Sequence, residues 1–196
     1  EHSSGRLDKT KILAELLQTA SPDEVKIICY ISQGKLLPPY KTVQFQISKK
    51  GIMAILSELL LVPEETVKEW YKERGDLGLI AEDHFSADCL LSIEEVYEKL
   101  RYIAQIEGSG SVQSKQEFVL SLLKQLDSVS VKYVIRIIAQ TMRLGFSDMT
   151  IVDALSWMYA GDKSIRKDLE VAYNVCADLG LVGQTLKIGG LQEIQK

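Results

Sequence analysis

The residues in this sequence best suited to chemistry lie in one turn, Arg143-Leu144-Gly145-Phe146-Ser147-Asp148. Gly145 fits a position just past a helix end, where a left-handed backbone costs least for a residue without Cβ, and Ser147 can cap the helix that follows. An arginine beside the free amides and positive dipole of a helix start suits a phosphate or another anion. The local pattern alone favours a simpler interpretation, two core helices joined by an ordinary cap.

Two helices must hold this turn. Residues 131–142 place apolar side chains at helical spacing, with a thin polar stripe on the other side formed by Lys132, Arg136, Gln140 and Arg143. This pattern predicts a helix that is buried on most of its circumference. The second helix begins at the Ser147 cap and continues to about Trp157.

The rest of the sequence is also typical of helices and contains no convincing strand pattern. Capping boxes begin at Ser21 and Ser92, Ser48 caps a further helix, and Pro63 opens one that ends at Gly75. The pattern predicts helices over residues 7–17, 22–34, 48–60, 63–75, 92–106, 118–126, 131–142, 147–157, 163–178 and 181–186, with an extended or looped segment at 43–47. We therefore predict an all-α fold, a compact multi-helix domain.

The glycines and serines of residues 108–111 predict a flexible link inside this domain. It would join two helical halves, about 6–107 and 112–196, of a single domain spanning 6–196. Residues 1–5, Glu-His-Ser-Ser-Gly, have the composition of an expression-tag remnant.

The two halves share a weak internal repeat. Residues 47–57 match residues 146–156 at a spacing of 99, and the preceding helices match at a spacing of 106, as in Val25 and Val131. Chance similarity between apolar helices is the alternative. A true repeat predicts a pseudo-two-fold axis with two capped helix starts facing the same way, one carrying Lys49 and Lys50 and the other Arg143.

The charge distribution and the lack of known catalytic motifs limit the classes of function that the sequence allows. The net charge is −4, but residues 58–107 hold 5 basic against 13 acidic residues, so the acidity is local and a nucleic-acid partner is not excluded. No phosphate-binding glycine loop or catalytic triad pattern occurs, and His84 is expected at the surface or in a cap. Cys29, Cys89 and Cys176 are odd in number and widely spaced, which predicts buried packing residues, no disulfide framework and no metal site.

No apolar run is long enough to cross a bilayer, and no signal-peptide pattern is present. We expect an intracellular protein with no membrane partner.

Four segments, in order along the chain, resemble the N-terminal DNA-binding domain of ATP-dependent DNA ligases, particularly the archaeal type. They are Gly75-Asp76-Leu77-Gly78 through Glu82, Leu91 through Tyr97, Arg143-Leu144-Gly145-Phe146-Ser147-Asp148 through Leu155, and Ala172-Tyr173-Asn174 through Gly180. The resemblance covers nearly the whole chain after the first residues.

This resemblance implies an all-helical, pseudo-two-fold domain that grips the minor groove on both sides of a nick while catalytic domains of the same parent chain close around the duplex. The family's nucleotidyltransferase lysine lies in a Lys-x-Asp-Gly motif that does not occur here. The chain alone is therefore not expected to be an enzyme or to hold a cofactor, whereas the parent would use ATP and Mg²⁺. The implied partners are duplex or nicked DNA and, in some family members, a sliding clamp. The implied location is the cytoplasm of a prokaryote or the nucleus of a eukaryote.

The resemblance also assigns residues to the DNA interface. The RLG turn, Arg143-Leu144-Gly145, implies phosphate contacts by Arg143, Gly145 and Ser147, and the GDLG turn places Gly75, Asp76 and Gly78 close to the groove. One departure occurs ahead of Ser48, where the family has a glycine-rich turn and this chain has Gln46-Ile47. From this sequence itself we infer that Lys49 and Lys50 supply charge there.

We predict a module that binds nicked duplex DNA through phosphates and groove shape, with little reading of bases. A rival interpretation from another class is an all-helical scaffold that binds protein, which the overall acidity favours. A stand-alone enzyme is the third, and it would need a catalytic centre that the sequence does not contain.

Overall fold

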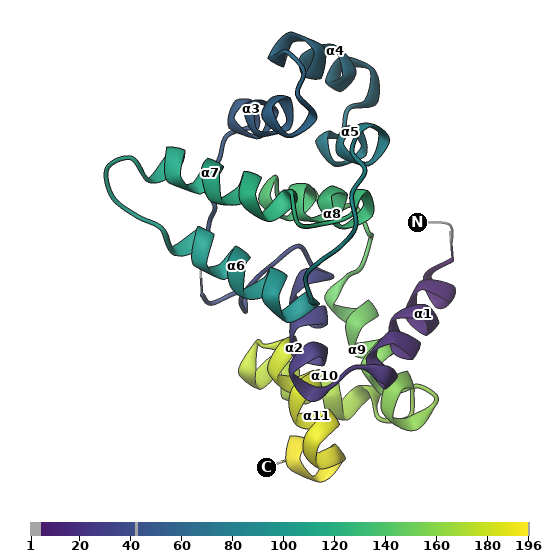
Figure 1. The fold of residues 1–196 in the computed structure, drawn as a ribbon. Helices are drawn as coiled ribbons and strands as arrows, with labels where there is room; N and C mark the ends of the chain where they lie inside the picture. The colour runs from purple at the N-terminus through teal and green to yellow at the C-terminus, as the bar shows by residue number, and fades with distance from the viewer. Residues whose placement is uncertain (1–4, 42, 196) are drawn as a thin grey trace. The chain divides into compact units, whose positions relative to one another are not determined.

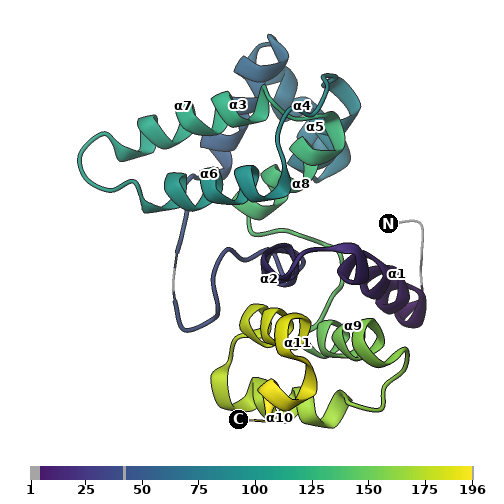
Figure 2. The ribbon, with the colours of Figure 1, turned by 60° about the horizontal axis from the view of Figure 1, so that its bottom comes forward.

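The computed structural model describes residues 5–41 and 43–195, which fold into helices joined by turns, with no β-strand among them (Figures 1 and 2). The predicted all-α class is confirmed. The helices are α1 (Arg6–Thr19), α2 (Pro22–Ile31), α3 (Lys49–Leu60), α4 (Glu64–Arg74), α5 (Leu77–His84), α6 (Ile93–Gln105), α7 (Ser111–Leu123), α8 (Ser128–Ile138), α9 (Asp148–Ala160), α10 (Arg166–Cys176) and α11 (Leu179–Ile194).

Hydrogen bonds at the helix starts confirm the predicted caps. The Ser21 hydroxyl accepts from the amide of Glu24 at 3.2 Å, and the Glu24 carboxylate accepts from the amide of Ser21 at 2.6 Å. Ser92 and Glu95 form the same reciprocal pair at the start of α6. Gly75 ends α4 in the left-handed conformation, with φ 66°. These ends are set by local chemistry, which is why the sequence predicts them.

The helix before the RLG turn is shorter than predicted. It ends at Ile138, because the amide of Thr141 donates to the carbonyl of Arg136 at 2.8 Å and Gln140 turns into the left-handed region with φ 55°. Two of the four residues of its polar stripe are buried: Lys132 is 4% exposed and Arg136 is 3% exposed. Lys132 pairs with Glu82 of α5 and Arg136 pairs with Asp76, the N-cap of α5, and helical periodicity cannot predict either contact.

Two helices exceed what the sequence pattern predicts. The eight-residue α5 begins within the GDLG turn, at Leu77, and α11 extends well beyond the expected residues 181–186. Glycines in α11 lower its intrinsic helix propensity, but they allow close packing. A Cβ on Gly180 would lie 2.5 Å from the ring of Tyr30, and one on Gly183 would lie 3.0 Å from Leu155. Tertiary contact therefore stabilises a helix that local propensity does not favour.

Some single-residue expectations also change. Cys29 is buried, but Cys89 is exposed and Cys176 is only half-buried, so the prediction of three buried cysteines is wrong for Cys89. His84 ends α5 and stacks on Trp70, with ring centroids 3.8 Å apart.

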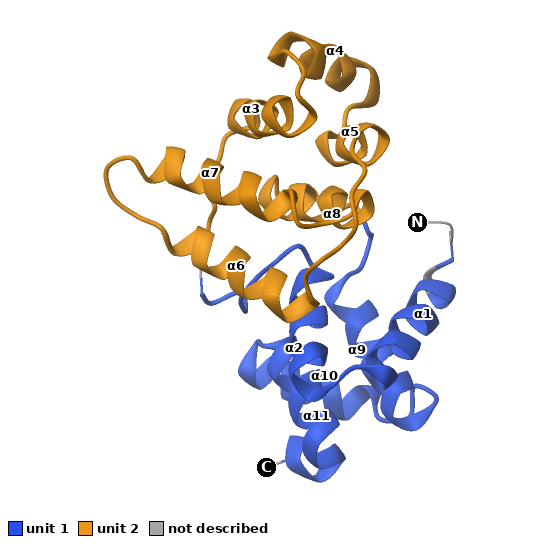
Figure 3. Ribbon diagram, viewed as in Figure 1, with its two compact units in different colours: residues 1–42, 144–196 blue, residues 43–143 orange. Residues whose placement is uncertain are grey.

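The chain forms two compact units (Figure 3). Unit 1 comprises residues 1–42 and 144–196, and unit 2 comprises residues 43–143. These units do not coincide with the halves predicted from the glycine-serine link. Residues 108–111 instead connect α6 to α7 inside unit 2, where α7 also packs on α3 and α8 packs on α5. The composition of a loop indicates flexibility but not which helices pack across it.

Helix order and caps extend the internal repeat to five helices. The caps Ser21 and Asp127 lie 106 residues apart, Ser48 and Ser147 lie 99 apart, and α4 and α10 have the same length at a spacing of 102. In chain order, α1–α5 correspond to α7–α11, and α6 has no counterpart. The pseudo-two-fold axis itself stays a prediction.

The repeats exchange helices between the units. In unit 2, α3 packs on α7 and α5 packs on α8; in unit 1, α9 packs on α1 and α11 packs on α2. Each unit thus combines the first two helices of one repeat with the last three of the other. The apolar faces that are buried in this way include Ile52, Leu123 and Ile135 in unit 2 and Leu17, Val25 and Leu155 in unit 1.

Within residues 5–41 and 43–195, no helix has the length and apolar character needed to cross a membrane.

Candidate nucleic-acid interface

The start of α3 lies in unit 2 and has the form of an anion site. The Ser48 hydroxyl accepts from the amide of Gly51 at 3.1 Å, and the first turn contains no acidic residue. The first amides of a helix have no acceptor within it, and the dipole is positive there. Lys49 and Lys50 are exposed beside these amides, and the ammonium of Lys49 lies 4.9 Å from the ring centroid of Tyr71.

Buried side chains and a lysine of α7 anchor the turn ahead of α3. Phe45 and Ile47 are buried, and Gln46 between them adopts the left-handed conformation with φ 55°. Gln46 therefore has the sign of φ that a glycine adopts without strain, although the sequence lacks glycine here. The ammonium of Lys115, from α7, lies 3.5 Å from the carbonyl of Gln44.

The start of α9 lies in unit 1 and repeats this arrangement. Ser147 accepts from the amide of Thr150 at 3.2 Å, and the Thr150 hydroxyl accepts from the amide of Ser147 at 3.3 Å. Gly145, two residues before the cap, is left-handed with φ 71°. The ammonium of Lys9, from α1, donates to the carbonyl of Leu144 at 3.1 Å.

One acidic residue distinguishes α9 from α3. Asp148 lies in the first turn of α9, where its carboxylate accepts from the hydroxyl of Tyr173 at 2.7 Å. Burial, together with this hydrogen bond and the charge of Asp148, raises the pKa of Tyr173 to about 12. The carboxylate weakens the positive field at this start, whereas the ammonium of Lys9 lies on the turn just before it.

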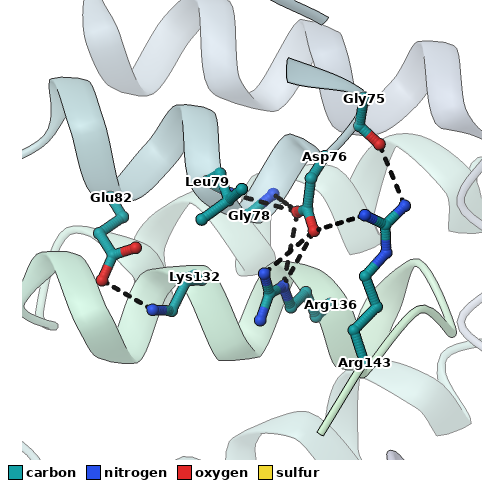
Figure 4. A network of polar contacts seen from close by, with 8 residues as sticks. All are labelled: Gly75, Asp76, Gly78, Leu79, Glu82, Lys132, Arg136 and Arg143. Atoms are coloured by element: carbon teal, nitrogen blue, oxygen red, sulfur yellow. Dashed lines mark hydrogen bonds and ion pairs between the residues drawn. The ribbon is translucent and has the colours of Figure 1, made fainter. Parts of the chain in front are cut away.

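Arg143, the first residue of the RLG turn, contacts the GDLG turn at Asp76, and both residues belong to unit 2 (Figure 4). The carboxylate of Asp76 caps α5 by accepting from the amides of Gly78 and Leu79, at 2.8 and 3.2 Å. Its other oxygen lies 3.0 Å from Arg136 and 3.4 Å from Arg143. Arg143 also donates to the carbonyl of Gly75 at 3.2 Å. One buried carboxylate therefore orients two arginines.

Gly78 allows α5 to lie against α8. A Cβ on this residue would stand 2.7 Å from the carbonyl oxygen of Lys132 and 3.0 Å from a side-chain carbon of Arg136. The adjoining ion pair between Lys132 and Glu82, at 2.7 Å, lies on the same helix pair (Figure 4). Gly78 thus has a packing role within the structure.

A pocket of about 310 Å³ in unit 2 brings several predicted residues together. Four of the residues assigned from the sequence contribute to its lining, namely Lys49, Gly75, Asp76 and Arg143. Among its lining residues Lys49, Asp76 and Arg143 are charged, and their formal charges sum to +1. The pocket has the charge and the polar donors that a phosphate group requires.

Comparison with known proteins identifies the family. A family model described as DNA ligase N terminus matches residues 1–156. The chain belongs to the DNA ligase N-terminal domain family. A probable DNA ligase of Persephonella marina is 34% identical over 200 residues, which cover 100% of this chain and 34% of the relative. The DNA ligase of Nitrosopumilus maritimus is 34% identical over 203 residues, with the same two coverages.

The DNA ligase of Thermoplasma volcanium is 32% identical over 196 residues, covering 96% of this chain and 33% of the relative. The chain thus spans about a third of the length of the relatives that it matches. The resemblance inferred from four sequence segments is confirmed at the level of the family.

Within this ligase N-terminal domain, Arg143 has partners that the sequence did not predict. Its guanidinium contacts Asp76 and Gly75, and its place beside the start of α9 stays a prediction. Arg143 itself has a left-handed φ of 56°. It is still 55% exposed at the side chain, so it remains open to a phosphate.

Three cations of the ligase N-terminal domain were not assigned to the site from the sequence. Arg136 is buried against Asp76, and Lys9 and Lys115 contact the turns ahead of α9 and α3. A signal for the lysines did exist: they lie 106 residues apart, the spacing of the first repeat segment. Extending that repeat to the preceding helices would have aligned them.

Proposed function

We propose that this chain is the DNA-binding module of an ATP-dependent DNA ligase, and that it grips nicked duplex DNA through phosphate and minor-groove contacts. Family membership supports a ligase module, and the two helix starts support phosphate binding in particular. The observation that carries the proposal is that the starts of α3 and α9 share the same local features. Each start has a serine cap, a left-handed residue two positions earlier and a lysine bonded to a carbonyl of the preceding turn.

In this proposal the amides at the starts of α3 and α9 bind phosphate oxygens directly. Lys49, Lys50 and Arg143 add charge and release counterions, while Gly145 allows the backbone to approach the phosphate. Asp76 does not face the polyanion with free charge, because Arg136 and Arg143 both neutralise it. The GDLG turn faces the groove, and its conformation is fixed by Gly75, Asp76 and Gly78. Contacts of this kind carry little sequence information, so binding should not depend on base sequence.

The nucleotidyltransferase lysine, ATP and Mg²⁺ would belong to other parts of the parent ligase. The present chain contributes binding and orientation, and the catalytic domains would seal the nick. A sliding clamp stays a predicted partner without an assigned site, and an intracellular location also stays a prediction.

The test is a fluorescence anisotropy titration of labelled nicked duplex at two salt concentrations. We expect binding that weakens steeply with salt, and equal affinity for two unrelated base sequences. Absence of binding at low salt, or binding independent of salt, would refute the proposal. A ligation assay with ATP and Mg²⁺ should give no product with this chain alone.

A protein-binding scaffold is the second candidate, favoured by an apolar row on unit 1. Val171, Val175 and Leu181 are 63%, 84% and 43% exposed and line a groove of about 530 Å³ between α10 and α11. This function predicts that the titration above shows no DNA binding. The two candidates are therefore separated by the same experiment.

A further inference from the structure

Lys9 and Lys115 occupy equivalent positions in the two repeats. They lie 106 residues apart, the same spacing as the helix caps Ser21 and Asp127 that follow them. Each projects from the first helix of its repeat onto a turn that belongs to the other repeat, Lys9 onto the turn before α9 and Lys115 onto the turn before α3. The helix exchange thus places one lysine behind each proposed phosphate site.

Lys115 is the more unusual of the two. It is 2% exposed and is the largest fully buried side chain in the described part of the protein. A buried ammonium is costly unless acceptors surround it, and its hydrogen-bond partner among the described residues is the Gln44 carbonyl, at 3.5 Å. A methionine of similar volume would fill this space without desolvating a charge. Core packing alone therefore does not explain a lysine here.

The carbonyls that accept from these lysines lie at neighbouring, not identical, positions of the two turns. Gln44 precedes the left-handed residue Gln46 by two positions, and Leu144 directly precedes the left-handed Gly145. A carbonyl oxygen near a phosphate site would repel the anion. An ammonium bonded to it cancels that dipole and holds the turn so that the amides of the next helix start face outward.

Neighbouring contacts reinforce the link between α7 and the α3 start. A Cβ on Gly51, in the first turn of α3, would lie 2.6 Å from the side-chain nitrogen of Gln116, the residue after Lys115. On the other unit, the ammonium of Lys9 lies 3.4 Å from the position that a Cβ on Gly145 would take. Each lysine therefore adjoins the backbone that forms its start.

We propose that Lys9 and Lys115 are paired positioning residues, each of which orients one of two phosphate-binding helix starts from behind without itself contacting the phosphate. The inference rests on the proposed DNA binding, and it adds the means by which the two starts are held in a binding geometry. It also explains why a charged side chain is kept in the interior of unit 2.

The decisive variant is Lys115→Met, compared with Lys124→Met, which removes the same charge from an exposed position at the end of the same helix. For Lys115→Met we expect the affinity for nicked duplex to fall about tenfold, as for loss of a hydrogen bond to a charged group. The slope of log affinity against log salt should stay at the wild-type value, because no phosphate contact is lost. The melting temperature should not fall, since a buried charge has been replaced by an apolar group.

Double-mutant cycles add a second readout. Lys115→Met and Lys49→Ala should be non-additive because both act on the α3 start, and Lys9→Met should be non-additive with Ser147→Ala. Lys115→Met and Lys9→Met should be additive, because each acts on its own start. A purely structural lysine would not give this pattern of coupling.

Three results would overturn the inference. The first is an affinity of Lys115→Met equal to that of Lys124→Met, and the second is a salt slope of Lys115→Met that is lower by about one, which marks a direct phosphate contact. The third is additivity of Lys115→Met with Lys49→Ala. If the unaltered chain shows no salt-dependent DNA binding, the proposed function itself fails. If it binds and only the lysine variants behave as wild type, the failure belongs to this inference alone.

Discussion

The guanidinium of Arg143 lies 3.4 Å from the carboxylate of Asp76, so one residue from each of the two turns that most resemble the ligase family joins the same polar cluster in unit 2. The guanidinium of Arg136 pairs with the same carboxylate oxygen at 3.0 Å and is almost fully buried, whereas the Arg143 side chain is 55% exposed. The two arginines therefore have separate tasks. Arg136 stabilises the fold of unit 2, and Arg143 is available to a ligand.

Arg143→Ala should weaken DNA binding about equally for all base sequences. We expect a loss of roughly five- to tenfold and a salt slope lower by about one, as for removal of one phosphate contact. Stability should change by less than about 1 kcal/mol because the Arg143 side chain is 55% exposed and Asp76 keeps its pair with Arg136. Anisotropy titrations at several salt concentrations measure both quantities. Arg101→Ala, which breaks an i,i+3 pair with Glu98 in the acidic segment, is the control and should leave the slope unchanged.

Asp76→Asn should destabilise the protein strongly while keeping a side chain that can cap α5. It removes the negative charge from the buried pair with Arg136, and breaking a buried pair from one side costs about 3–5 kcal/mol. Urea unfolding followed by circular dichroism measures the change. The matched variant Asp83→Asn removes the partner of Arg74, whose side chain is 56% exposed, and should cost less than about 1 kcal/mol. Equal losses in the two variants would contradict the assignment.

Gln46→Gly should stabilise the fold. Its left-handed φ of 55° strains a residue with a Cβ, so glycine should raise the free energy of unfolding by about 0.5–1 kcal/mol after its greater backbone entropy is counted. The comparison variant Gln113→Gly lies inside α7 and should lower it by a similar amount. A fall in stability for Gln46→Gly would show that the side chain, not the backbone, matters at this turn.

Gly78→Ala and Gly51→Ala should differ although both sites are crowded. The added Cβ at Gly78 meets the backbone oxygen of Lys132 at 2.7 Å, which cannot move without shifting α8. At Gly51 the closest atom, at 2.6 Å, is the end of the flexible Gln116 side chain. We expect a loss of about 2–3 kcal/mol for Gly78→Ala and nearly none for Gly51→Ala, measured by thermal unfolding. Similar losses would mean that α5 and α8 adjust more freely than their packing indicates.

The contact between Tyr173 and Asp148 should add a pH dependence in the alkaline range. The pKa of Tyr173 is raised to about 12, above the ordinary value of 10.0, so folding favours the protonated phenol. This stabilisation is complete below pH 10 and is lost as the pH rises from about 10 to about 12. Urea unfolding of the native chain and of Tyr173→Phe should therefore converge in stability over that range. A constant difference at all pH values would exclude the linkage.

Local signals in the sequence determined the helix starts, the all-α class and the family. Ser21, Ser48 and Ser147 act on amides within three residues of themselves, so their roles can be inferred without knowing the fold. The repeat was visible for the same reason, because apolar spacing and caps recur at fixed distances along the chain.

Only the tertiary structure decided which helices pack together and which charges are buried. The loop at residues 108–111 is not a boundary between the two units, because helices of different repeats pack together on both sides of it. The apolar area buried in this packing stabilises the units more than the composition of one loop can separate them. The pairing of Arg143 with Asp76 and the burial of Lys115 depend on segments far apart in sequence that the folded chain brings within hydrogen-bond distance. A sequence gives the type and order of such side chains, but their partners are set by contacts that no local spacing encodes.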